Sequence, residues 1–68
     1  MEPSIAANAE WACRTLLVYQ QYTGSNKEDA LRDLLSDLMH WADEQGFDFG
    51  YELEWARTHY AEEIAEQD

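Results

Sequence analysis

A leucine-rich segment at residues 27–45 places the tightest limit on what this chain can fold into. Its apolar side chains recur at intervals of three and four residues, which puts them on one face of an α-helix. The stripe consists of Leu31, Leu34, Leu35, Leu38 and Ala42, flanked by Met39 and Trp41. The segment is therefore predicted to be an amphipathic helix.

Stop and start signals bound this helix. Ser25 and Glu28 have the S-x-x-E spacing of a capping box, and Asp29 adds negative charge to the first turn. Gly46 stands where a left-handed residue would end the helix. These signals predict a helix over residues 27–45.

A first helix is predicted over about residues 5–22, with Ser4 as its N-terminal cap and Gly24 as its stop. Residues 15–22 are rich in β-formers, but they lack the strict alternation of a half-buried strand. One face of this helix carries Ile5, Ala9, Ala12, Leu16 and Tyr19.

A third helix is predicted over residues 49–66, beginning at Asp48 or shortly after. Its stripe consists of Phe49, Leu53, Ala56, Tyr60 and Ile64. Both breaks between helices are short, so successive helices must pack as neighbours. The expected fold is all-α: a compact bundle of three amphipathic helices with short connections, forming a single domain over residues 1–68.

Two helices carry a second row of large side chains, in addition to the stripe that a three-helix monomer needs for its core. These rows are Trp11, Val18 and Tyr22 on the first helix, and Tyr51 and Trp55 on the third. Either these rows are core, with the first helix buried on two sides, or they anchor a dimer or partner interface, where aromatic residues are favoured.

The chain carries 15 acidic and 4 basic residues, for a net charge of −11. It lacks the basic surface that binds nucleic acid or an anionic membrane, so its expected partners are basic surfaces or metal cations. It has no apolar run long enough to span a bilayer and a single cysteine, Cys13. The pattern of a basic n-region, an apolar h-region and a cleavage site is not found, so we expect an unexported protein. We expect a cytoplasmic protein of marginal stability, either a monomer or a homodimer.

Part of the acidic charge forms a row on the second helix. Asp29, Asp33, Asp37 and Glu44 fall within about 80° of arc, opposite the leucine stripe and with Arg32 as the nearby base. Asp29, Asp33 and Asp37 recur every ~6 Å along the helix, comparable with successive phosphates of a nucleic-acid strand, and Glu44 follows about 10 Å further on. The negative field is extended by Asp43, Glu52, Glu54, Glu62, Glu63 and Glu66. Such a row could occupy a basic groove, or it could simply confer solubility.

Motifs for chemistry are weak. The pattern His-aromatic-Ala-acid-Glu occurs twice, beginning at His40 and at His59. Each histidine could bind a metal, titrate as a pH switch, or pair structurally with the nearby carboxylates. The E-x-x-E pair typical of all-α pyrophosphohydrolases occurs once, at residues 63–66. Cys13 lies mid-helix among apolar residues, where a thiol is usually inert packing. We therefore expect that the protein is not an enzyme, and that it has no catalytic residues, no metal-binding residues and no cofactor.

Three stretches resemble small proteins of plasmids and prophages: DLLSDLMHWAD at residues 33–43, GFDF at 46–49 and ARTHY at 56–60. They lie in roughly the last two thirds of the chain. In size, charge and helical content the chain is also similar to anti-CRISPR and anti-restriction inhibitors, several of which imitate nucleic acid. Those families share no common motif, so this resemblance assigns no residue a role.

The function expected on these grounds is non-enzymatic inhibition by nucleic-acid mimicry in the bacterial host cytoplasm, most specifically of DNA binding by a type I CRISPR surveillance complex. The alternative is a homodimeric helical interaction module, either antitoxin-like or regulatory. The expected partner-binding residues are Asp29, Asp33, Asp37, Asp43, Glu44, Glu52, Glu62, Glu63, Glu66, Tyr51 and Trp55.

Overall fold

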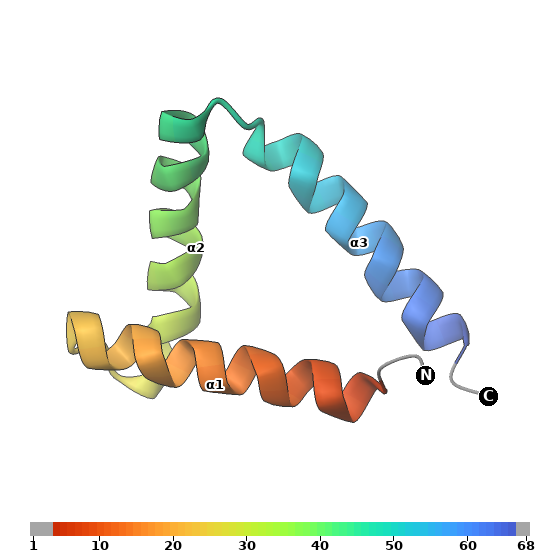
Figure 1. The fold of residues 1–68 in the computed structure, drawn as a ribbon, viewed down its shortest axis with the longest axis horizontal. Coiled ribbons are helices and arrows are strands. Elements are labelled where there is room, and N and C mark those ends of the chain that lie inside the picture. Colours follow the sequence, from red (N-terminus) through yellow and green to blue (C-terminus); the bar gives the residue numbers. More distant parts are fainter. Residues whose placement is uncertain (1–3, 67–68) are drawn as a thin grey trace. The chain divides into compact units, whose positions relative to one another are not determined.

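The structure, a computed structural model, describes residues 4–66 and contains three α-helices (Figure 1). They are α1 (Ile5–Thr23), α2 (Lys27–Gln45) and α3 (Phe49–Ala65). No strand occurs within residues 4–66. The all-α prediction is confirmed, and each helix begins and ends within one residue of its predicted bounds.

The chain divides into two units, Met1–Asp37 and Leu38–Asp68. The first unit holds α1 and the beginning of α2, and the second holds the end of α2 and α3.

Local capping explains both ends of α1. The Ala7 N–H donates to the Ser4 hydroxyl at 3.1 Å, which makes Ser4 the N-cap as predicted. At the other end, Gly24 has a left-handed φ of 75°, and its N–H donates to the Gln20 carbonyl at 2.8 Å. This single bond is the αL stop that glycine tolerates best.

The predicted capping box at Ser25 is wrong by one residue. The side chain of Asn26 accepts from the Asp29 N–H at 2.9 Å, so Asn26 occupies the N-cap of α2. Asn and Ser are about equally good caps, and local preference therefore does not choose between adjacent candidates. The Ser25 hydroxyl instead donates to Asp33 at 2.8 Å.

A Schellman motif ends α2. The Phe47 N–H donates to the Ala42 carbonyl at 2.8 Å, and the N–H of Gly46, with φ 82°, donates to Asp43. The rings of Trp41 and Phe47 stack at 5.7 Å across this turn, which is the apolar contact that usually accompanies the motif.

The next helix, α3, begins directly after this turn. Asp48 is its N-cap, because the Asp48 side chain accepts from the Tyr51 N–H at 3.1 Å. This agrees with the start predicted from the sequence.

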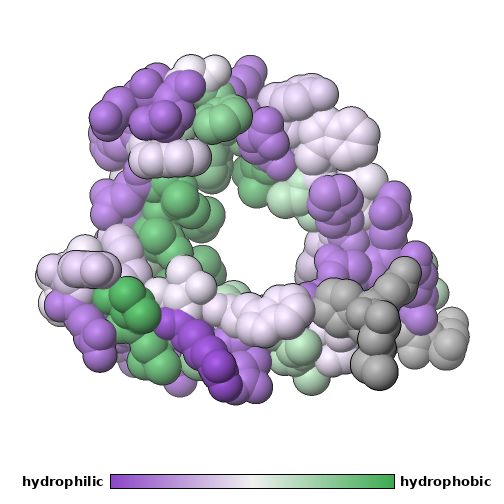
Figure 2. All heavy atoms as spheres, viewed as in Figure 1, coloured by the Kyte–Doolittle hydropathy of each residue, from purple (hydrophilic) through white to green (hydrophobic). Residues whose placement is uncertain are grey.

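The leucine stripe forms on α2, where Figure 2 shows hydrophobic side chains gathered along one side of the helix. Most side chains of this stripe are exposed. Among residues 4–66 the buried apolar side chains are Ala30 and Ala42, whereas Leu31 is 59% exposed.

No helix within residues 4–66 combines the length and the apolarity that a membrane crossing requires.

Candidate partner-binding surface

Two carboxylates of the predicted acidic row are hydrogen-bonded inside the first unit. The Tyr19 hydroxyl, from α1, donates to Asp37 at 2.5 Å. The Ser25 hydroxyl, from the connection before α2, donates to Asp33 at 2.8 Å. These bonds link residues 33 and 37 of α2 to the chain that precedes this helix.

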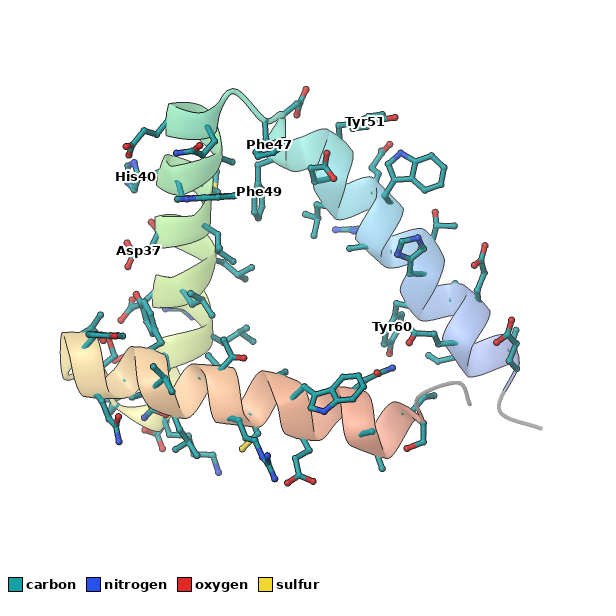
Figure 3. All side chains as sticks on the ribbon, viewed as in Figure 1. Asp37, His40, Phe47, Phe49, Tyr51 and Tyr60 are labelled. Atoms are coloured by element: carbon teal, nitrogen blue, oxygen red, sulfur yellow. The ribbon has the colours of Figure 1, made fainter. Side chains whose placement is uncertain are left out.

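The acidic row therefore has two kinds of members. Asp33 and Asp37 accept hydrogen bonds, so a change to either one also disturbs the first unit. Asp29 and Glu44 are exposed at the two ends of the row. Asp37 and His40 extend to the same side of α2 in Figure 3.

The contact with Asp37 changes the acidity of Tyr19. The hydrogen bond to Asp37 is the main reason that the pKa of Tyr19 is raised from 10.0 to about 12. Partial burial and the negative charges of Asp37 and Asp33 act in the same direction. An anionic phenolate would lose the hydrogen bond and face a carboxylate, so the fold favours the neutral phenol.

We expect a tyrosinate absorbance titration of the folded protein to contain a step near pH 12 that is absent in Tyr19→Phe. Because the folded pKa lies above the unfolded one, this contact stabilises the fold fully below pH 10 and is lost between pH 10 and about 12. Asp37→Asn should move the step toward pH 10. An unchanged step in Asp37→Asn would contradict this assignment.

On α3, an exposed row of rings extends along one face. Tyr51 and Trp55 make an edge-on contact with ring centroids 6.4 Å apart, and His59 lies 6.3 Å beyond Trp55 at a tilt of 47°. Tyr51 and Tyr60 extend from opposite sides of α3 (Figure 3). The ring row is therefore separate from the apolar stripe that contains Tyr60.

The structure places the predicted partner-binding residues on α2, on α3 and at the end of α3. Most of them are exposed, whereas Asp33 and Glu63 are half-buried. The exposed members are Asp29, Asp37, Asp43, Glu44, Glu52, Glu62, Glu66, Tyr51 and Trp55. Tyr51 and Trp55 come together in the ring row, and Asp33 and Asp37 contact the chain before α2.

Sequence reasoning missed three participants. Tyr19 and Ser25 bind the acidic row, and Thr58 shares an open recess on α3 with Tyr51, Glu54 and Trp55. The recess has a sequence signal, because Tyr51 and Trp55, and likewise Glu54 and Thr58, are four residues apart on one helix. The contacts of Tyr19 and Ser25 have no comparable signal.

The residues considered for chemistry are dispersed. In the part of the chain that the structure describes, no three His, Cys, Asp or Glu side chains lie close enough together to hold a metal ion. His59 contacts the Trp55 ring, and His40 is exposed on α2. Cys13 is exposed rather than packed among apolar side chains, which corrects the expectation for this thiol.

No protein-family model, curated protein or solved structure matches this chain. Its function must therefore be argued from the charges and side chains on its surface.

Proposed function

We propose that this protein is a non-enzymatic binding protein that docks acidic helix faces onto a basic protein surface. The observation that carries the proposal is the unneutralised charge. Four basic side chains cannot pair one-to-one with fifteen acids, and one of the four, Arg14, already pairs with Glu10 inside α1. The acids at both ends of the α2 row are left exposed to solvent.

A basic groove that binds nucleic acid is the type of partner that this surface fits best. Three acids of the row, Asp29, Asp33 and Asp37, recur every ~6 Å along one helix face. A dense negative field speeds encounter with a positive surface. By occupying such a groove the protein would inhibit nucleic-acid binding. Its resemblance to anti-CRISPR inhibitors makes a type I surveillance complex the specific target to test.

The second candidate is a helical interaction module that forms a homodimer. The observation that favours it is the exposure of large aromatic side chains, including Trp11 at 56% and Tyr22 at 86%. Aromatic side chains are enriched at protein–protein interfaces. Sedimentation equilibrium would separate the two candidates. A dimer that Trp11→Ala weakens would support the homodimeric module, and a monomer at all concentrations would reject it.

The charge-reversing variant Asp29→Lys/Glu44→Lys should displace DNA from a type I surveillance complex roughly tenfold less well than the unaltered protein, since close interfacial charges contribute on the order of 1 kcal/mol or more. These two acids are preferred over Asp33 and Asp37, whose replacement would also break internal hydrogen bonds. Displacement by the unaltered protein should weaken as salt is raised, and less steeply for the variant.

A matched control is Glu10→Lys/Glu28→Lys, which changes the net charge equally from positions outside the row. Glu28 matches Asp29 because both lie in the first turn of α2. The proposal requires the control to displace DNA better than Asp29→Lys/Glu44→Lys. Equal loss in both variants would mean that only net charge matters, and failure of the unaltered protein to displace DNA would reject this target.

A further inference from the structure

The open recess on α3 is lined by two pairs of side chains, each pair one helical turn apart. Tyr51 and Trp55 supply aromatic rings, and Glu54 and Thr58 supply a carboxylate and a hydroxyl. Because all four residues belong to one continuous helix, the backbone of α3 alone sets their spacing.

The Trp55 ring is held in place although half of its surface is exposed. Tyr51 meets it edge-on at 76°, and His59 contacts it from the following turn. Contacts on both sides restrict the rotamers of Trp55. A ligand that stacks on the indole would therefore lose little affinity to the ordering of this side chain. At 50% exposure, enough of the ring remains open for such a ligand.

The polar pair offers hydrogen-bond acceptors. The Thr58 hydroxyl donates its proton to the Glu54 backbone carbonyl at 3.2 Å, so its oxygen is left to accept a hydrogen bond. The Glu54 carboxylate accepts as well and carries a negative charge. Two oxygen acceptors therefore lie beside two aromatic rings.

We propose that this recess binds an arginine side chain from a basic segment of the partner protein. A guanidinium is planar, stacks on aromatic faces, and carries five N–H donors and no acceptor. It would stack on Trp55 while donating to Glu54 and Thr58. A lysine ammonium matches the charge and can also lie over a ring face, but it lacks the planar stacking surface and the fork of donors, so the recess favours arginine.

Charge complementarity supports a basic partner segment. The helix α3 carries four glutamates against one arginine, Arg57. Glu62 lies seven residues beyond Trp55 and shares its face, so a second cation of the same segment would meet a carboxylate there. The inference rests on the proposed function in one respect, namely that the partner is a basic protein.

The test uses two synthetic peptides of equal length and charge, one alternating arginine with glycine and the other lysine with glycine. The arginine peptide should shift the indole N–H resonance of Trp55 saturably, with the Trp11 and Trp41 resonances as internal references. It should bind roughly two- to fivefold more tightly than the lysine peptide, as expected for one exposed stacking contact.

Two variants and two matched controls locate the contact. Trp55→Leu and Glu54→Gln should each weaken binding of the arginine peptide by about two- to fivefold. Trp11→Leu removes a similarly exposed indole from α1. Glu28→Gln removes an equal charge from an exposed position of α2 outside the acidic row. Both should bind as the unaltered protein does. Because Glu54→Gln is nearly isosteric at an exposed site, it tests the contact without risk to the fold.

Equal affinity for both peptides, equal shifts at all three indoles, or unchanged affinity in Glu54→Gln would each overturn the assignment. The two proposals fail separately. Selective arginine binding at Trp55 without displacement of DNA would reject the proposed inhibition and keep the recess. Displacement of DNA by Trp55→Leu and Glu54→Gln at unaltered strength, with no arginine selectivity, would reject the recess and keep the inhibition.

Discussion

Replacing Ala30 by leucine is expected to lower the free energy of unfolding by about 1–3 kcal/mol, the usual cost of overpacking a filled site. Ala30 is 2% exposed, so the added methyl groups must displace neighbouring side chains or backbone. Domains of this size commonly gain only ~3–5 kcal/mol from their core. Ala30→Leu should therefore remove a large part of the stability, as measured by urea unfolding followed by circular dichroism.

The matched control for this substitution is Ala12→Leu. Ala12 belongs to the predicted apolar stripe of α1 but is exposed in the structure. Its replacement should change stability by no more than about 0.5 kcal/mol. If Ala12→Leu were as destabilising as Ala30→Leu, the burial assigned to these two alanines would be wrong.

Gly46→Ala and Gly50→Ala are expected to change stability in opposite directions. Gly46 has φ 82° in the Schellman turn, where a residue with a Cβ costs about 1–2 kcal/mol. A Cβ at Gly46 would meet nothing within 4 Å, so the whole cost comes from the backbone conformation. Gly50 lies within the first turn of α3, where alanine is favoured by about 0.5–1 kcal/mol.

The comparison is well matched because a Cβ at Gly50 would make only an ordinary contact, 3.5 Å from the Asp48 side chain. Thermal unfolding of both variants under identical conditions measures the difference. A stabilising Gly46→Ala would contradict the left-handed conformation assigned to the end of α2. A destabilising Gly50→Ala would contradict a regular helical start for α3.

These substitutions also prepare the binding experiments. The variants used to test the proposed function and the recess change exposed side chains, and their expected cost in stability is small. Ala30→Leu and Gly46→Ala lower the stability of the fold and leave every residue proposed to contact the partner unchanged. If a variant at an exposed side chain loses binding while its unfolding midpoint is unchanged, the loss comes from the removed contact with the partner and not from unfolding.

The three helices and their ends could be predicted from short stretches of sequence. Ser4, Gly24, Gly46 and Asp48 cap or stop the helices as expected, because each acts on backbone groups within about one turn. The one error, the cap at Ser25, arose because the adjacent Asn26 is an equally good candidate. The acids and rings of α3 could likewise be placed on their faces, since helical periodicity alone sets that arrangement.

Only the tertiary structure decided which of these side chains are buried or hydrogen-bonded to another element of the fold. Helical periodicity assigns Asp33 and Asp37 to an exposed acidic face, and it contains no information about the approach of Tyr19 and Ser25. It also places the leucines of α2 on one apolar face, whereas the buried apolar residues of the described chain are Ala30 and Ala42. The physical reason is range: capping and periodicity act over a few residues, whereas burial and hydrogen bonds between elements depend on the path of the whole chain.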